Sequence, residues 1–405
     1  MTLSKINFRD NFIKKQIAII GIISFTLVLW GCVIEDDDAP NTTNVPSVPS
    51  EPSTPGGSNP GGSNPGGSNP GGSDPVTTEP GGNNPGGNTP SGNNFTVSKA
   101  NEWATAVAAI TAAKSGDYSI TVTASFSLPG STSATFGSGT SSRPGKTITL
   151  SGNHTISLAE DSKGHLLSIR GGQTVIMQDL KLVGHSENNN WLVDIYGEGA
   201  FTMQGSASVS GNTGSYTASG GVLVSGSYSI FTMRDNASVS NNYSGAGAGV
   251  GVAKGSTFIM QGNSSVSGNT CHNASGGGGV FVDINSTFIM QDNASVSGNT
   301  TIHPDSSGGG VYSILGTFTM QGNSSISGNT SRYRGGGVSL NSGTFTMEGG
   351  TVYGSGAGSL SNTASKDGAA LYASSSSTAK YGNGVLILPH TDLQTMYTNA
   401  TISYP

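Results

Sequence analysis

The sequence predicts an all-β protein, built as a parallel β-helix with a short N-terminal capping helix and a disordered tether before it. Six methionines recur at intervals of 30, 27, 30, 30 and 27 residues, which indicates an array of like units. Each unit holds three short segments in which apolar and polar residues alternate, the period of a β-strand. Glycine and asparagine, which accept the positive φ of sharp turns, separate these segments. The recurring methionines are Met203, Met233, Met260, Met290, Met320 and Met347.

Residues 1–31 are predicted to be a signal peptide that precedes a lipidated cysteine. A basic start and an apolar run of about 14 residues lead into Leu-Val-Leu-Trp-Gly-Cys. This ending resembles the lipobox of bacterial lipoproteins, with Leu29 three residues before Cys32 and Gly31 directly before it. A membrane-spanning anchor is the alternative, but it requires about 20 apolar residues. We therefore expect an exported protein, anchored by lipid on Cys32 to the bacterial outer membrane or cell surface.

Residues 32–94 contain the lipidated cysteine and the predicted tether. Most of this segment is Pro, Gly, Ser, Asn and Thr, and the repeat Gly-Gly-Ser-Asn-Pro occurs three times in succession. It has too few apolar residues to bury surface on folding, so we expect disorder. A chain of this kind holds a folded domain away from a membrane.

Residues 95–130 are predicted to form an N-terminal cap made of one helix and one strand. Ser98 is placed to cap the start of the helix, and Gly116 is placed to end it. The alternating run 118–128 predicts a strand with one buried face. A short amphipathic helix that leads into β structure suits the open end of a stack. The apolar face of the helix would hold Trp103, Val107 and Ile110.

Residues 131–405 are predicted to form the β-helix, with coils of 27 to 30 residues. Stacking about ten such coils at about 4.8 Å would align like side chains in columns. A phenylalanine column would lie inside beside the methionines, and an asparagine column would bond as a ladder, since an amide both donates and accepts. The less regular segment 369–405 would form a C-terminal cap. The two columns are Phe201, Phe231, Phe258, Phe288, Phe318 and Phe345, and Asn212, Asn242, Asn269, Asn299 and Asn329.

The repeats also resemble those of a known class of bacterial surface proteins. Gly-Gly-Gly-Val at 308–311 is paired with Ser-Gly-Asn-Thr at 327–330. Over about residues 146–385 the chain resembles right-handed parallel β-helix surface proteins with polymorphic-membrane-protein-like repeats. The resemblance implies a right-handed, pectate-lyase-like fold and lipid anchoring. Its motifs specify architecture and name no activity.

Composition and spacing argue against several kinds of chemistry. Residues 95–405 carry 13 basic and 15 acidic side chains, so nucleic acid is not the expected partner. We expect no cofactor and no metal site, because the six histidines lack ligand spacing. Glycoside hydrolysis needs two carboxyl groups across one bond, whereas four aspartates are expected in different coils and at different phases of the repeat. The chain is therefore not expected to be an enzyme. These aspartates are Asp235, Asp283, Asp292 and Asp305.

Cys271 has no disulfide partner in the predicted β-helix. In an exported protein an unpaired thiol is unusual. We expect Cys271 to be an inert loop or turn residue; the alternative is a reactive or cross-linking thiol.

A candidate binding surface appears where the repeat is broken. If the valines of each Val-x-Val segment point inward, the residue between them points outward. This places Phe281 and Tyr312 side by side, with Arg332, Tyr333 and Arg334 in the following turn. Exposed aromatic and basic groups can stack on a sugar ring or bind an acidic partner. The alternative is packing between coils with solvated arginines.

The function that fits these features is non-enzymatic adhesion. A lipid-anchored β-helix would bind a glycan or an extracellular protein of a host or neighbouring cell, with the membrane as its other partner. One alternative is a polysaccharide lyase or hydrolase carried on a β-helix. Another is a structural or antigenic spacer that has no ligand.

Overall fold

The computed structural model describes residues 92–130, 135–137, 145–214, 220–274, 276–374, 376–381, 386–388, 393–395 and 401–403. Within them the chain winds into a parallel β-helix of the right-handed type with about 9 turns, which confirms the expected fold class. The predicted signal peptide, Cys32 and the tether up to residue 91 lie outside the described residues. Among the described residues, no helix is long and apolar enough to cross a membrane.

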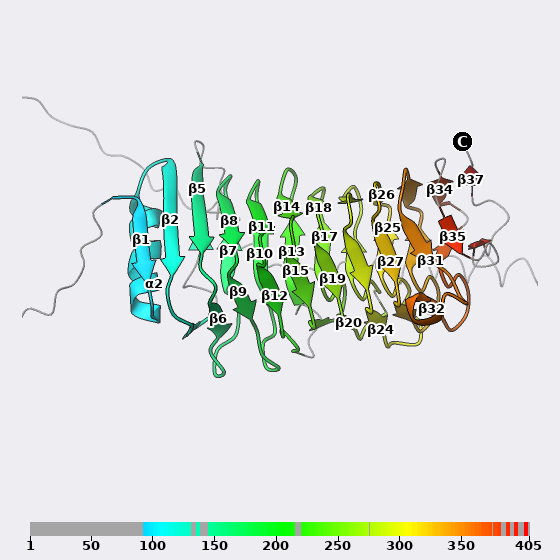
Figure 1. Cartoon of the computed structure of the whole chain (residues 1–405), viewed down its shortest axis with the longest axis horizontal. Helices are drawn as coiled ribbons and strands as arrows, with labels where there is room; N and C mark the ends of the chain where they lie inside the picture. The colour runs from blue at the N-terminus through cyan, green and yellow to red at the C-terminus, as the bar shows by residue number, and fades with distance from the viewer. Residues whose placement is uncertain are drawn as a thin grey trace, which may run out of the picture. The chain divides into compact units, whose positions relative to one another are not determined.

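The Phe-x-Met segments of successive coils form one parallel sheet, sheet A, and the Ser-Val-Ser segments form a second, sheet B (Figure 1). Sheet A contains β1 (Asn94–Val97), β2 (Gly116–Val122), β5 (Lys146–Ser151), β8 (Thr174–Gln178), β11 (Ala200–Gln204), β14 (Ile230–Met233), β18 (Thr257–Met260), β22 (Thr287–Met290), β26 (Thr317–Met320), β30 (Thr344–Met347), β34 (Thr378–Tyr381) and β37 (Thr401–Ser403). Sheet B contains β3 (Phe126–Leu128), β6 (Thr155–Leu158), β9 (Lys181–Val183), β12 (Ser208–Ser210), β15 (Ser238–Ser240), β19 (Ser265–Ser267), β23 (Ser295–Ser297), β27 (Ser325–Ser327), β31 (Thr351–Tyr353) and β35 (Leu386–Leu388).

The remaining strands form sheet C and the shorter sheet D. Sheet C contains β4 (Thr135–Phe136), β7 (Leu167–Ile169), β10 (Trp191–Tyr196), β13 (Gly220–Ser225), β17 (Val250–Ala253), β21 (Val280–Val282), β25 (Val311–Ile314), β29 (Val338–Asn341), β33 (Leu371–Ala373) and β36 (Leu393–Thr395). Sheet D contains β16 (Tyr243–Ser244), β20 (Thr270–Cys271), β24 (Thr300–Thr301), β28 (Thr330–Ser331) and β32 (Thr363–Ala364). Sheet D adds a fourth strand, between sheets B and C, to coils for which the sequence predicted three. A single 3₁₀ turn spans Gly358–Leu360.

The N-terminal helix forms as predicted, but its start, its end and the strand after it differ. Helix α2 (Ala100–Ala112) begins after Lys99, and Ser98 instead donates its N–H (2.8 Å) and its hydroxyl (3.0 Å) to Glu102. Gly116 does not end the helix; it begins β2 with φ of +147°. The run 118–128 divides between β2 and β3, because the chain turns there from sheet A to sheet B.

Both ends of the stack continue the sheets. At the N-terminal end β1 pairs with β2, and the strands of segment 95–130 already pair with the next coil, β2 with β5 and β3 with β6. In the predicted C-terminal cap, β34 pairs with β30, and β37 pairs with β34. The described strands there thus extend the β-helix.

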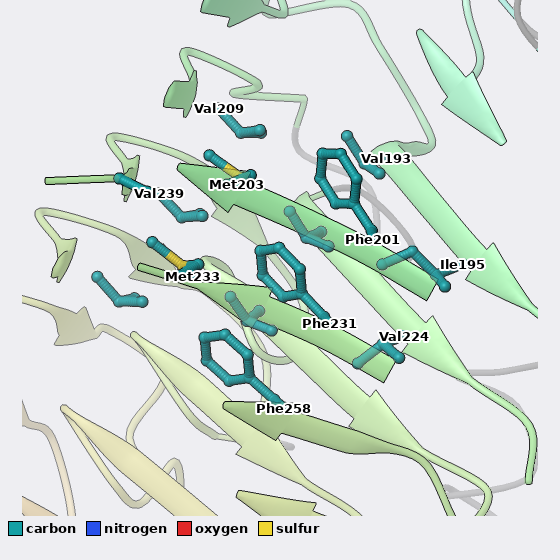
Figure 2. Packing of buried hydrophobic residues seen from close by; sticks show 14 of the residues in the cluster. Val193, Ile195, Phe201, Met203, Val209, Val224, Phe231, Met233, Val239 and Phe258 are labelled. Carbon is teal, nitrogen blue, oxygen red and sulfur yellow. The ribbon is translucent and has the colours of Figure 1, made fainter. Parts of the chain in front are cut away.

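The core is a set of side-chain columns that follow the stacking of the coils. Phe201, Phe231 and Phe258 lie ring over ring, with centroids 5.5 and 4.9 Å apart and planes within 11° (Figure 2). Met203 and Met233 lie beside them in the same strands (Figure 2). In-register parallel pairing places identical residues above one another, so the rings stack at the strand spacing. The predicted phenylalanine and methionine columns are present and buried throughout.

The asparagine column is a hydrogen-bonded ladder, as predicted. Asn269 donates its backbone N–H (3.0 Å) and its Nδ2 (2.9 Å) to Oδ1 of Asn299, and Nδ2 also donates to the Val239 carbonyl (3.2 Å). Its own Oδ1 accepts the N–H and Nδ2 of Asn242, both at 3.0 Å. The buried amide is therefore fully satisfied on both sides. The sequence missed two members, one at each end of the ladder: Asn188 and Asn362.

Cys271 lies in a strand of sheet D and not in the predicted loop or turn. Its column contains Ser244 before it and Thr301 after it. The thiol is fully buried and donates to the Gly245 carbonyl at 3.1 Å. Burial raises the pKa of Cys271 to about 11, so the thiol stays protonated at neutral pH. Because a thiolate is the reactive form, this position suits packing and not covalent chemistry.

Candidate ligand-binding site

The outer face of sheet C brings two of the predicted contact residues, Phe281 and Tyr312, together. Phe281 of β21 pairs in register with Tyr312 of β25, which pairs with Ser339 of β29. Ser339 pairs in turn with Tyr372 of β33. Since alternate residues of a strand face the same side, these four residues form one outward column. The sequence analysis predicted that Phe281 and Tyr312 are neighbours and missed Tyr372.

Phe281 and Tyr312 are in contact and are only half-exposed. Their ring centroids are 5.9 Å apart, and their planes are tilted by 50°. The loop that precedes β25 lies directly against Tyr312. If Gly308, whose φ is +70°, carried a Cβ, that atom would lie only 2.7 Å from the Tyr312 Cβ. Burial also raises the pKa of the Tyr312 hydroxyl, while its hydrogen bond with Asn341 acts in the opposite direction. Both rings are therefore only partly accessible to solvent.

Arg334 is the centre of an aromatic–basic cluster, which we define as Tyr333, Arg334, Lys366, Asp367 and Tyr372. Its Nε donates to Oδ2 of Asp367 at 3.2 Å, and both side chains are mostly buried, 13% and 17% exposed. The guanidinium carbon lies 4.3 Å from the Tyr333 ring centroid and 4.8 Å from that of Tyr372. These are cation–π distances, so the Arg334 guanidinium contacts both aromatic rings and also forms the ion pair with Asp367.

Two further cations lie at the surface of this cluster. Lys366 is exposed; its Nζ donates to the Tyr333 hydroxyl at 3.1 Å and lies 4.7 Å from the ring centroid. Arg332 is also exposed, and its backbone N–H is bonded to the Thr301 hydroxyl at 3.2 Å. Together with Arg334 they set three positive charges against the single negative charge of Asp367. The result is an accessible surface on which positive charge exceeds negative charge, beside the half-buried ring of Tyr333.

The residues that sequence reasoning missed here are Lys366, Asp367 and Tyr372. They come from the next coil, where Arg334 and Asp367 form an isolated parallel bridge and Lys366 N–H bonds to the Tyr333 carbonyl at 2.9 Å. Aligning residues 332–338 with residues 365–371, the register that the β29–β33 pairing gives, brings Lys366 opposite Tyr333 and Asp367 opposite Arg334, and Tyr372 follows this segment, opposite Ser339. That alignment was a usable signal, but the two segments share only a glycine.

The aspartates occupy structural positions, and one expectation about them is corrected. Asp235 and Asp292 lie at the same phase, in the turn from sheet A to sheet B, two coils apart. Each carboxylate accepts the backbone N–H of a glycine in the preceding coil, Gly205 and Gly262, both at 2.9 Å. Glycines alternate with aspartates in this turn, so the charges are separated by about two strand spacings. Asp283 and Asp305 lie elsewhere, in the turn from sheet C to sheet A and in the loop from sheet D to sheet C.

No metal-binding group is found among the described residues: no three or more His, Cys, Asp or Glu side chains gather there in a metal-binding arrangement. The described histidines instead serve local structure. His272 stacks on Tyr243, with ring centroids 4.7 Å apart and planes within 7°. Burial lowers its pKa below the ordinary value.

Comparison of the chain with protein-family models, with curated proteins and with solved structures gives no match.

Proposed function

We propose that the chain is a lipid-anchored, non-enzymatic surface protein whose aromatic–basic cluster binds an acidic glycan. The observation that carries this proposal is the arrangement at the surface of the cluster. Exposed Lys366 lies against the half-buried ring of Tyr333, Arg334 contacts the same ring, and exposed Arg332 directly precedes Tyr333 in the chain. A sugar ring can stack on an aromatic side chain, and its carboxylate or sulfate groups can pair with the two cations.

Support for an anionic ligand comes from charge. Residues 95–405 are close to neutral overall, with 13 basic and 15 acidic groups, yet two of these basic groups lie in the cluster and a third, Arg332, directly precedes it in the chain. Arg334 already shares its charge with a buried acid, whereas Arg332 and Lys366 face solvent. Electrostatic attraction to an anionic polymer would therefore act mainly through Arg332 and Lys366.

The glycan proposal is tested by removing these two exposed cations together. We expect Arg332→Gln with Lys366→Gln to weaken binding of heparin oligosaccharides by about tenfold or more, since two charge-assisted contacts are lost. Titration calorimetry on the full chain measures the dissociation constant, with neutral dextran as the blank. Arg334 is left intact, because its removal would strand Asp367 as a buried acid.

Lys181→Gln with Lys254→Gln is the matched control, because both lysines are exposed and lie in other coils. This variant should bind as the parent does. Equal weakening in the two double variants would mean that net charge and not the cluster attracts the ligand. Absence of saturable binding by the parent chain would favour the spacer alternative, and release of reducing or unsaturated ends from the oligosaccharides would favour an enzyme.

The placement at the cell surface rests on the sequence of residues 17–32. We expect the chain to incorporate labelled palmitate in a bacterial host and to lose the label in Cys32→Ala, because the thioether to the lipid forms at that sulfur. External protease should remove the β-helix from intact cells that carry the parent chain. An unlabelled parent chain, or one wholly shielded from protease, would contradict lipid anchoring at the surface.

A further inference from the structure

Two outward columns of sheet A, in strands β8 to β30, differ from the site on sheet C because they carry no charge; the outward positions that follow the methionines of these strands include Arg234 and Glu348. From β8 to β30, each of seven strands contributes one residue to each of these two columns, and in-register pairing aligns them. Nine of these 14 residues are threonine, four are isoleucine and one is alanine. All are at least partly exposed. In one column lie Thr174, Ala200, Ile230, Thr257, Thr287, Thr317 and Thr344, and in the other Ile176, Thr202, Thr232, Ile259, Ile289, Thr319 and Thr346.

Strand preference alone does not explain this composition. The outward positions of sheet B, from β12 to β27, lie in strands of the same coils and are all serine. Threonine, with its branched Cβ, is favoured over serine in strands generally, so preference by itself would place it on both faces. The threonines of sheet A differ from the serines of sheet B by a methyl group, and the four isoleucines add further apolar surface to sheet A. Threonine also holds its side chain in fewer rotamers, which makes its array more rigid.

The hydroxyls of the threonine face are available to an outside partner. In the described part of the chain, none of the nine threonine side chains donates a hydrogen bond to protein. Elsewhere hydroxyls pair between coils, Ser127 with Ser157 at 2.8 Å between β3 and β6 and Thr363 with Thr330 at 3.1 Å in sheet D, whereas the described serines of β12 to β27 show no such pair. The threonine face therefore presents an unpaired lattice of hydroxyls and methyls.

The geometry of this lattice points to its ligand. Its repeat is about 4.8 Å between coils and about 6.6 Å between alternate residues of a strand. The water oxygens on the prism faces of ice repeat on a similar scale, at a slightly shorter spacing in the first direction and a longer one in the second. Hydroxyls at such spacings can bond to water molecules held at lattice positions, while the methyl groups leave the water between them to bond to itself. We propose that the outer face of sheet A orders water and adsorbs to ice.

Other occupants fit this face less well. A protein partner would be anchored by Trp, Tyr or Arg, and a sugar would stack on an aromatic ring; none of the 14 positions holds any of these residues. Nucleic acid would need cations, and the positions hold none. The rim adds apolar surface in the turns from sheet C to sheet A, where Tyr228, Ile284 and Leu315 are 77%, 44% and 50% exposed. Between β10 and β30, the charged residues described in these turns are Glu198, Lys254 and Asp283.

The test measures the fraction of full-length protein that enters slowly growing ice, in a nonionic detergent with bovine albumin as the blank. We expect the parent chain to be enriched in the ice. Thr287→Lys with Thr317→Lys should lower that enrichment about tenfold or more. The matched control is Ser295→Lys with Ser325→Lys, the same change in the same two coils on sheet B, which should alter it less than about twofold.

A conservative variant keeps the test sound if the lysines disturb folding. Thr287→Ser with Thr317→Ser retains both hydroxyls and removes only the methyls, and it should also lower enrichment. No enrichment of the parent chain, or equal losses on the two faces, would overturn the inference. So would light scattering that shows a dimer in the parent and a monomer in the threonine variants, because the face would then be a self-interface. None of these outcomes bears on the glycan site of sheet C.

Discussion

Replacing Phe288 by alanine is expected to lower the free energy of unfolding by about 4 kcal/mol, as for other large-to-small changes in a core. Its ring is fully buried and lies between those of Phe258 and Phe318, with centroids 4.9 and 4.8 Å away. Both neighbours would lose a stacking partner, and stacking contributes beyond the buried area. The fixed spacing of the coils prevents collapse onto the cavity, because backbone hydrogen bonds join each strand to the coils on either side.

The measurement is urea denaturation of the full chain followed by far-ultraviolet circular dichroism. Phe281→Ala is the matched control, since this phenylalanine belongs to the same coil but lies half-exposed on the outer face. We expect it to cost about 1 kcal/mol, in proportion to the smaller apolar area that it buries. Equal costs for the two substitutions would contradict the assignment of one ring to the core and the other to the surface.

Replacing Asn299 by aspartate is expected to be about as destabilising, roughly 4 kcal/mol at pH 7, because it buries an unpaired charge. Asn299 Nδ2 donates to Oδ1 of Asn329 and to the Val266 carbonyl, both at 3.0 Å. A carboxylate cannot donate, so it would face these two acceptors at hydrogen-bond distance. It would keep the two bonds that Asn299 Oδ1 accepts from Asn269.

The pH dependence of this variant gives a second readout. Burial and the two facing acceptors should raise the pKa of the introduced carboxyl above that of the unfolded chain, about 4. The loss of unfolding free energy relative to the parent chain should therefore be largest above the raised pKa. It should shrink as the pH falls towards about 4, because the introduced carboxyl is then protonated in the folded chain. A deficit that does not change with pH would mean that the variant fails for another reason, such as a shifted strand.

Asn293→Asp provides the control for the ladder. Asn293 lies in the same coil and also bonds to the asparagine of the preceding coil, Nδ2 to Asn263 Oδ1 at 3.2 Å, but it is exposed. Water can solvate a carboxylate there, so we expect a cost of about 0.5 kcal/mol or less. If this variant were as unstable as Asn299→Asp, the effect would belong to asparagine columns in general and not to burial.

The columns of the core could be predicted because they depend on periodicity alone. Phe288 and Met290 recur at fixed positions in each unit, and in-register parallel pairing places equal positions above one another. The same reasoning found the asparagine ladder. It missed Asn188 and Asn362, because the coils that contain them depart from the repeat and the ladder positions differ by 24 and 33 residues from their partners.

The contacts of the candidate site depend on loops whose lengths vary between coils. Arg334 is 33 residues from Asp367 and meets Tyr372 only because β29 pairs with β33 in one register. The burial of Tyr312 likewise depends on how the preceding glycine loop folds back over it. Local residue patterns do not contain this information, since a loop can add a residue without changing the strands on either side.

The repeat, the β-helical class and the residues of the inward columns could all be predicted from the sequence. The repeat length equals one coil, so like residues lie above one another in successive coils. The tertiary structure decided the rest: the strands of sheet D, the division of the run 118–128 between two sheets, and the neighbours of Arg334. It also aligned the threonines of sheet A into two unpaired columns while the serines faced another side. The physical reason is that strand alternation is local, whereas the path of each turn depends on the coil beneath it.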